Sequence, residues 1–289
     1  MKIVHKIEEV RSAVAEARGE GKLVGFVPTM GFLHKGHISL VEISRESTGY
    51  QVMSIFVNRL QFNDPGDFKN YPKSIEKDIE MAKAAGVDLL FIPDDTEMYS
   101  NNLTHVNVDL LTLNLCGAHR PGHFEGVFTV VSKLFNIIQP HAAVFGQKDI
   151  QQAVSIEKMV SDLNFPVKII IAPIVREEDG LAMSSRNKHL SEEQRVSALS
   201  IYRSLKRGES AITDGERDVE RIISLMIDVI KTGNPDSIDY VTAVNYDDLS
   251  IAEKITGKTV IAVAAFWGTT RLIDNMIIEP HGDGFKCIY

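Results

Sequence analysis

The sequence contains little cysteine, no long apolar run and no excess of basic residues. Only two cysteines occur, Cys116 and Cys287, far apart and outside any CxxC pair. This usage is typical of reduced thiols rather than of a disulfide framework, so we expect a cytoplasmic protein. No run approaches about 20 apolar residues, and the charged segment 1–22 is unlike a secretory signal. We therefore expect a soluble globular protein without a membrane span.

The formal net charge is -8, which gives no basic surface for a nucleic-acid backbone. Nucleic acid is thus not the expected partner, although a local basic groove stays open, and the chemistry of small metabolites fits better. With 289 residues, 44% of them hydrophobic, the chain can build one large domain or two ordinary ones.

Short apolar segments alternate with helical patterns over about the first 170 residues, which predicts a parallel sheet flanked by helices. Ile3, Ile7, Val10 and Val14 recur at helical spacing near the N-terminus. The clearest helix is predicted at 124–139, where one apolar stripe stops at Pro140. The expected strands are 23–27, 52–57, 87–92, 142–145 and 167–171.

Beyond about residue 187 the pattern changes. Ser191 to Gln194 fits a helix capping box, charged helices follow to about Lys231, and apolar segments near Tyr240, Val260 and Ile277 suggest strands. The change places a domain boundary between 176 and 190. We predict a larger domain at 1–180 and a smaller C-terminal α+β domain at 181–289.

The segment PTMGFLHKGH, residues 28–37, joins the first predicted strand to a helix that begins near Gly36. The carboxyl end of a parallel strand beside a helix N-terminus is where open α/β sheets bind anions. Gly31 and Gly36 permit a close approach of backbone to ligand, and His34 and His37 can face the same way. Two imidazoles there can stabilise charge that develops on a phosphoryl group.

Four further stretches carry polar residues whose role stays open on the residues alone. After the second strand, Gln61 can bind a ligand hydroxyl or carboxylate or simply satisfy nearby backbone, which is the commoner case. The run CGAHRPGHFEG combines His119, Arg120 and His123; its spacing favours a structural or anion-binding loop over zinc. In VFGQKDIQQ, Lys148 can contact phosphate, or Asp149 and Gln152 can form an ordinary helix cap.

The last such stretch, VREEDGLAMSSRN, places Ser184, Ser185 and Arg186 in a loop to which Gly180 gives backbone freedom. Hydroxyl groups and a forked guanidinium suit phosphate oxygens, although SSRN is also common in plain turns.

Taken together, HxGH followed by a Met-Ser-Ser-Arg loop resembles the nucleotidyl-transferring α/β superfamily that includes class I aminoacyl-tRNA synthetases. The ordered motifs PTMGFLHKGH, FVNRLQF with YPKS, CGAHRPGHFEG, VFGQKDIQQ, VREEDGLAMSSRN and TRLIDN resemble the pantothenate synthetase family over nearly the full length. The resemblance implies a doubly wound, Rossmann-like sheet of the HxGH type. It also implies ATP-dependent condensation of pantoate with β-alanine, with Mg²⁺, through a pantoyl adenylate that yields AMP and pyrophosphate.

The resemblance also assigns roles to individual positions. It implies catalytic roles for His34, His37 and Lys148. The implied pantoate- and β-alanine-binding residues are Asn58, Gln61, Tyr71 and Gln152. The implied ATP-binding residues are Pro28, Thr29, Met30, Gly31, His34, Gly36, His37, Gly146, Gln147, Lys148, Asp149, Val175, Met183, Ser184, Ser185 and Arg186. No metal-ligating residue is assigned, and a homodimer is expected.

Two positions depart from the expected pattern. Arg59 stands where proline is expected and His119 where a small residue is expected, and both can add positive charge beside the substrate loops. Phe266 and Trp267 also look unusual and receive no functional interpretation.

A transferase that adenylates a phosphate would have no reason to carry Gln61 and Gln152 together, and a tRNA-binding synthetase fragment would need a basic surface that this acidic chain lacks. A nucleotide-binding protein without turnover is the remaining alternative, and AMP release only when pantoate and β-alanine are both supplied distinguishes it from the synthetase.

Overall fold

A computed structural model describes residues 1–63 and 65–289. Of residues 65 and 67 it describes the backbone but not the side chains. The described chain divides into two compact units. Unit 1 consists of Met1–Thr112, Cys116–Gly146 and Gln152–Ala172, and unit 2 consists of Leu113–Leu115, Gln147–Gln151 and Pro173–Tyr289. Apart from its two short earlier segments, unit 2 begins at Pro173, whereas the sequence predicted a domain boundary after residue 180.

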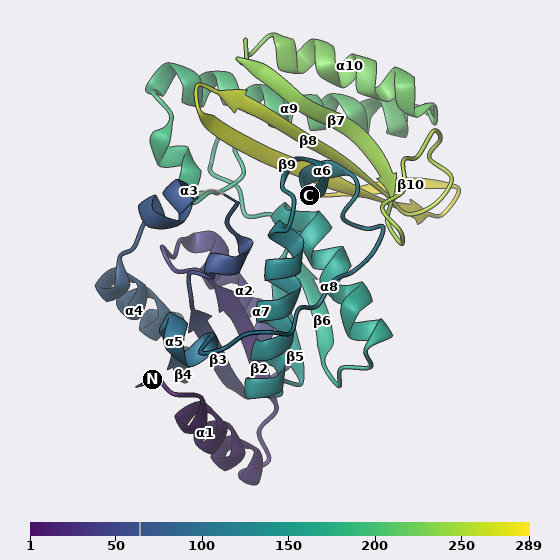
Figure 1. Cartoon of the computed structure of the whole chain (residues 1–289). Coiled ribbons are helices and arrows are strands. Elements are labelled where there is room, and N and C mark those ends of the chain that lie inside the picture. The colour runs from purple at the N-terminus through teal and green to yellow at the C-terminus, as the bar shows by residue number, and fades with distance from the viewer. Residues whose placement is uncertain (64) are drawn as a thin grey trace. The chain divides into compact units, whose positions relative to one another are not determined.

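Unit 1 is built on a six-stranded parallel sheet with the order β1-β4-β3-β2-β5-β6 (Figure 1). Its strands are β1 (Lys2–Val4), β2 (Val24–Thr29), β3 (Tyr50–Ile55), β4 (Leu89–Phe91), β5 (Ala142–Gly146) and β6 (Lys168–Ala172). The order reverses between β2 and β5, so the loops after these two strands flank the switch point where doubly wound sheets bind ligands. The predicted parallel sheet is confirmed.

Helices cover both faces of this sheet. Alternate strand residues such as Val27, Met53 and Val144 form one core cluster with apolar residues of α2 and α4. Phe26 points to the other face, where it contacts Phe135 of α7. The helices and 3₁₀ turns up to residue 162 are α1 (Ile7–Gly19), α2 (Lys35–Arg45), η1 (Arg59–Gln61), α3 (Pro65–Asn70), α4 (Ile75–Ala84), α5 (Asp95–Met98), α6 (Leu115–His119), α7 (His123–Ile138), η2 (Gln147–Asp149) and α8 (Ile150–Asp162).

The structure differs from the sequence-based expectation at the N-terminus. Ile3 does not continue the apolar face of α1, because it lies in β1 and pairs with Leu90 of β4. The predicted stop of α7 is confirmed: Gln139 adopts a left-handed conformation (φ 49°) immediately before Pro140.

Unit 2 contains a four-stranded antiparallel sheet in which the strands lie in the order β10 (Gly284–Ile288), β9 (Thr270–His281), β8 (Thr259–Trp267) and β7 (Ser237–Asn245). Helices α9 and α10 pack together and bury a shared apolar cluster against the sheet. Trp267 is part of this cluster, and its indole N–H donates to the Gly233 carbonyl at 3.2 Å, which gives this residue a structural role. The elements after residue 162 are β6, η3 (Ser185–His189), α9 (Glu192–Thr213), α10 (Val219–Lys231), β7 (Ser237–Asn245), β8 (Thr259–Trp267), β9 (Thr270–His281) and β10 (Gly284–Ile288).

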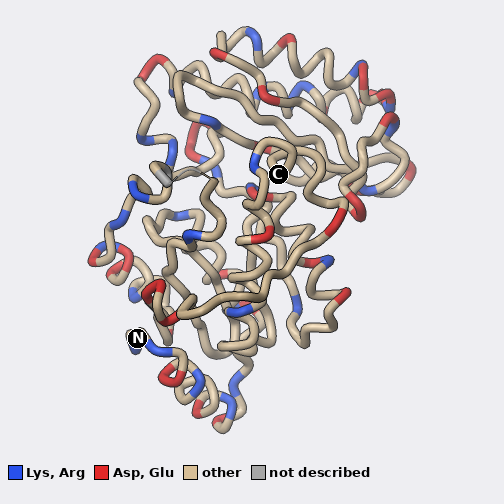
Figure 2. Tube along the Cα trace, viewed as in Figure 1, with Lys and Arg blue, Asp and Glu red and all other residues tan. Residues whose placement is uncertain are grey.

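The predicted capping box at the start of α9 is confirmed. The Ser191 hydroxyl accepts from the Gln194 N–H, and the Gln194 side chain accepts from the Ser191 N–H, both at 3.1 Å. Basic and acidic positions are interspersed in both units (Figure 2). In the described parts of the chain, no helix is both long and apolar enough to cross a bilayer.

Candidate active site

The HxGH segment leaves the sheet at the carboxyl end of β2. The Thr29 hydroxyl donates to the Ser54 carbonyl of β3 at 2.7 Å and accepts from the Gly31 N–H at 3.2 Å. These bonds turn the chain sharply after the strand, and Gly31 takes a positive φ of 82° that favours glycine. Pro28, Thr29, Met30 and Gly31 therefore lie at the sheet edge where the sequence placed them.

Asp78 of α4 holds the next two residues of this segment. Its two carboxylate oxygens accept the Phe32 N–H at 2.8 Å and the Leu33 N–H at 2.7 Å, and the residue is only 2% exposed. A Cβ added to Gly31 would lie 3.0 Å from this carboxylate, so the loop fits closely around it. The sequence analysis missed Asp78. A carboxylate four residues before Ala82 shares its helical face, but this spacing does not indicate the distant loop that Asp78 holds.

His34 and His37 close the N-terminus of α2 reciprocally. His34 is the N-cap, and its Nδ1 accepts from the Gly36 N–H at 3.2 Å; the Nδ1 of His37 accepts from the His34 N–H at 3.3 Å. The ring centroids are 4.1 Å apart. Because both Nδ1 atoms accept backbone N–H groups, each neutral ring carries its proton on Nε2. The two imidazoles are thus adjacent, with their planes tilted by 41°.

Asn58 and Gln61 lie beside this segment, where Asn58 caps η1 and Gln61 ends it, after β3. The Asn58 amide donates to the Gln61 side-chain oxygen at 3.1 Å, and the Gln61 amide lies 2.9 Å from the Met30 sulfur. Asn58 also accepts from the Tyr99 hydroxyl at 2.8 Å. Burial raises the pKa of Tyr99 far above its ordinary value, which keeps this phenol protonated as a donor.

Side chains of the CGAHRPGHFEG segment contact the backbone carbonyl of Gln61. His123 donates from Nδ1 to the Gln61 carbonyl at 2.6 Å, and its Nε2 lies 3.1 Å from Nη1 of Arg120. A carbonyl can only accept, so Nδ1 carries the proton and Nε2 accepts from Arg120. This pattern favours the structural interpretation of the loop over zinc. At Gly126, an added Cβ would lie 2.3 Å from the Leu60 carbonyl oxygen, so α7 and η1 touch only because this residue is glycine.

The remaining candidates in unit 1 are placed as follows. The Tyr71 ring contacts Phe62, next to Gln61, with centroids 5.7 Å apart. Gly146 ends β5 and Gln152 lies in the first turn of α8. Arg59 forms an ion pair with Asp95 at 2.8 Å, so its charge, which the sequence analysis flagged, is paired.

In unit 2 the VREEDGLAMSSRN segment folds back on itself. The Met183 N–H donates to the Val175 carbonyl and the Glu177 N–H to the Leu181 carbonyl, at 2.9 and 2.8 Å. Gly180 takes φ 98°, and an added Cβ would lie 2.3 Å from the Tyr202 ring. The glycine is therefore required by a tight turn and a close approach, which is a different reason from the backbone freedom that the sequence suggested.

This folded-back segment, the hairpin of residues 175–187, ends at the candidate phosphate-binding residues. Ser184 caps η3 by accepting the Arg186 N–H at 3.2 Å, which leaves the hydroxyl proton as a donor, and Arg186 is exposed. Two of the three acidic residues upstream are paired, since Glu177 and Asp179 both contact Arg195. One small pocket is lined by Lys148, Leu181, Ala182, Ser184, Asn187, Ile201, Leu272, Ile273 and Asp274. Unit 2 thus brings Lys148 and Ser184 together.

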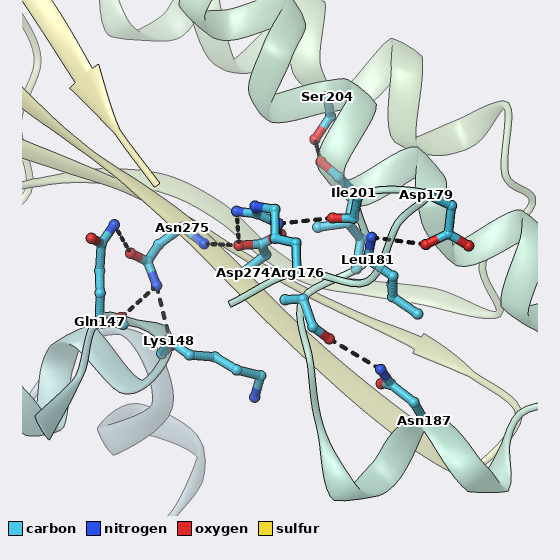
Figure 3. A network of polar contacts seen from close by, with 12 residues as sticks. Gln147, Lys148, Arg176, Asp179, Leu181, Asn187, Ile201, Ser204, Asp274 and Asn275 are labelled. Carbon is cyan, nitrogen blue, oxygen red and sulfur yellow. Dashed lines mark hydrogen bonds and ion pairs between the residues drawn. The ribbon is translucent and has the colours of Figure 1, made fainter. Parts of the chain in front are cut away.

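A buried polar network lies beside this pocket (Figure 3). Arg176 donates to both carboxylate oxygens of Asp274, at 2.7 and 2.9 Å. Burial raises the pKa of Asp274, and the guanidinium opposes that rise. Gln147 bonds Asn275 at 3.2 Å, while Asp149 lies on the surface of the same 3₁₀ turn. TRLIDN was noted in the sequence, but neither Asp274 nor Asn275 was assigned a role.

A family model described as pantoate-beta-alanine ligase matches residues 2–277. The chain belongs to this family. As a member of the pantoate-beta-alanine ligase family it is an enzyme of the ligase class, and the suspected resemblance is confirmed.

Relatives support the same assignment. The pantothenate synthetase of Acetivibrio thermocellus is 50% identical over 280 residues, which cover 96% of this chain and 100% of the relative. That of Desulfitobacterium hafniense strain DCB-2 is 53% identical over 280 residues, covering 96% and 99%.

Solved structures of the family have the same fold. The pantothenate synthetase of Thermus thermophilus superposes with a TM-score of 0.89 at 41% identity, covering 95% of this chain and 98% of that chain. The pantoate-beta-alanine ligase of Francisella tularensis, solved in complex with beta-gamma ATP and beta-alanine, has a TM-score of 0.76 at 33% identity, covering 95% and 97%. The doubly wound sheet with a smaller α+β part is therefore the fold of the family.

Proposed function

We propose that the chain condenses pantoate with β-alanine to form pantothenate, using ATP and releasing AMP and pyrophosphate. Family membership supports the overall reaction. The ligands of the Francisella tularensis relative support ATP and β-alanine as substrates. The observation that carries the proposal is the HxGH segment, which lies at the carboxyl end of β2 beside the switch point with both histidines held at a helix N-terminus.

The reaction needs an activated acid, because a free carboxylate has too poor a leaving group to condense with an amine. A pantoate carboxylate oxygen attacks the α-phosphorus of ATP, the bond to pyrophosphate breaks, and pantoyl adenylate forms. The β-alanine amine then attacks the acyl carbon, loses a proton and expels AMP. Protein donors can stabilise the charge of the first step without a covalent bond to the chain.

The residues of each unit suit parts of this reaction. In unit 1, the Nε2–H groups of His34 and His37 are donors for phosphoryl oxygens, and the Gln61 and Gln152 amides are neutral donors for the hydroxyl and carboxylate oxygens of pantoate. In unit 2, Lys148 and the Ser184–Arg186 segment can bind the phosphates of ATP. Arg186 can donate two N–H groups in a fork.

We propose that Mg²⁺ enters with ATP. Across the residues whose placement the structure describes, no three His, Cys, Asp or Glu side chains cluster as metal ligands. We propose that phosphate oxygens of ATP and water supply most ligands of the Mg²⁺ ion, as is common for nucleotide substrates. When bound, the ion neutralises part of the phosphate charge.

The family resemblance also leads us to propose a cytoplasmic homodimer, for which sedimentation velocity is the test.

Product analysis tests the proposed function. The purified protein is incubated with MgATP and with pantoate, β-alanine or both, and nucleotides are separated by anion-exchange chromatography. Continuous release of AMP and pyrophosphate only when both acids are present supports the ligase. ATP binding without turnover, or release of ADP and phosphate, overturns the proposal.

A further inference from the structure

Two adjacent residues of β9 contact η2 and the hairpin, the two segments of unit 2 that we propose bind the phosphates of ATP. Asp274 and Asn275 are 3% and 1% exposed. Neighbouring side chains in a strand point to opposite faces, and Asp274 shares its face with Leu272 and Met276, which belong to the core beneath α9. One strand can therefore contact the hairpin from one face and η2 from the other.

Asn275 holds the backbone of the turn that carries Lys148. Its amide nitrogen donates to the Gln147 carbonyl at 3.0 Å and to the Lys148 carbonyl at 3.1 Å. Its oxygen accepts from the Gln147 side chain at 3.2 Å. Two of these bonds hold consecutive peptide groups, which fixes where the Lys148 side chain begins, and the third holds the Gln147 side chain.

Asp274 holds the base of the hairpin that leads to Ser184. Its carboxylate accepts two N–H groups of Arg176, which also donates to the Gly180 carbonyl at 3.0 Å. The guanidinium lies 4.4 Å from the centroid of the Tyr202 ring. A planar group held by a carboxylate, a carbonyl and an aromatic face has one orientation, so the hairpin is fixed to β9.

The two halves of the network are joined. The Asn275 N–H donates to the Asp274 carboxylate at 2.8 Å, and Figure 3 shows Lys148 and the hairpin on either side of this pair. The pocket that Lys148 shares with Ser184 is lined by Asp274 as well. Arg176 pairs the Asp274 carboxylate, which would otherwise repel an anion in that pocket.

We propose that Asn275 and the Arg176–Asp274 pair are positioning residues for adenylate formation, because together they set the spacing between Lys148 and the Ser184–Arg186 segment. The proposal rests on the proposed function for the identity of the reaction. Asp274 lines the pocket, but its carboxylate is held by Arg176, and we assign no substrate contact to Asp274 or Asn275. Their effect is transmitted through the backbone of η2 and of the hairpin.

The main test is Asn275→Asp, which keeps the shape of the side chain but replaces its two N–H donors with an oxygen that faces two carbonyls. Displacement of Lys148 should lower the single-turnover rate of adenylate formation by about 10- to 100-fold. The second half-reaction, started from supplied pantoyl adenylate, should stay within about twofold of wild type because pyrophosphate has already left. Asn275→Ser keeps one donor and should lose less.

The matched control is Asp239→Asn. Asp239 of β7 pairs with Arg271 of β9 at 2.6 Å, so this change breaks a different ion pair of the same sheet. It should leave both half-reactions near wild type. Equal losses in the two half-reactions of Asn275→Asp, or rates that match those of Asp239→Asn, would overturn the proposal.

Calorimetry with a non-hydrolysable ATP analogue separates this inference from the proposed function. If the wild type binds the analogue but forms no AMP, the proposed function fails, while about tenfold weaker binding by Asn275→Asp or Asn275→Ser still supports the network. Unchanged analogue binding by both folded variants together with unchanged adenylation contradicts it.

Discussion

His34 and His37 have ring orientations that follow from helix capping. Each Nδ1 accepts a backbone N–H at the start of α2, so the two functions of each ring, capping and donation, belong to different nitrogens. The two functions can therefore be separated by substitution, which distinguishes a structural histidine from one that also contacts substrate.

We expect His34→Asn to retain the cap and lose catalysis. Asparagine is a good N-cap, so the free energy of unfolding should change by less than about 1 kcal/mol. Loss of the Nε2 donor should slow adenylation by about 10²-fold. His34→Gln, whose amide reaches toward the Nε2 position, should recover part of the rate. Thermal unfolding and single-turnover kinetics measure the two effects; normal adenylation in His34→Asn would reject the role.

Gln61 and Gln152 should affect the acid substrate and not the nucleotide. Gln61→Ala and Gln152→Ala should each raise the KM for pantoate by about tenfold while binding of an ATP analogue stays nearly unchanged, because the proposed contacts are made to pantoate alone. If Gln152→Ala instead lowers stability by about 1 kcal/mol with normal pantoate kinetics, its role is helix capping.

The connection between β2 and α2 depends on one carboxylate from α4. Asp78→Asn places an NH₂ group against one of the two loop N–H donors, so we expect a loss of about 1–3 kcal/mol in the free energy of unfolding and a fall in adenylation. Asp88→Asn is the control, because Asp88 accepts the Gln51 N–H at 2.7 Å in the same sheet but outside the loop. Denaturant unfolding paired with kinetics should show similar stability losses but slow adenylation only for Asp78→Asn; equal rates would show that Asp78 does not position the loop.

The packing of α7 against η1 provides a second test at this level. Gly126→Ala should push η1 away, lower stability by about 1–3 kcal/mol and raise the KM for pantoate, since Gln61 ends η1. Gly19→Ala, where an added Cβ meets no atom within 4 Å, should leave both unchanged. A KM that does not move in a destabilised Gly126→Ala would disconnect this contact from substrate binding.

The strands and helices of unit 1 were predictable because hydrophobic periodicity is local. Segments such as 142–145 and 124–139 could be read within a window of a few turns. Asp78 and Asn275 could not, because their partners lie 45 and 127 residues away along the chain and no local pattern encodes such pairs. Ile3 was misread for a related reason: whether three residues form a strand depends on the distant partner β4.

The whole chain contributes to the proposed reaction from both units. Unit 1 carries the HxGH segment and the candidate pantoate residues, and unit 2 carries Lys148 and Ser184–Arg186. Each unit by itself therefore carries residues whose proposed partners are phosphoryl or phosphate oxygens, and the candidate pantoate residues belong to unit 1. The common chemical requirement is attack of the carboxylate on the α-phosphorus, the step in which the proposed catalytic roles of His34, His37 and Lys148 lie.

Transfer of ¹⁸O from labelled pantoate tests that step most directly. If a carboxylate oxygen attacks the α-phosphorus, that oxygen stays on phosphorus when β-alanine breaks the acyl–oxygen bond. Mass spectrometry of the products of complete turnover should therefore find one ¹⁸O in AMP and none in pyrophosphate. AMP without label, or label in inorganic phosphate, would contradict the pantoyl-adenylate mechanism.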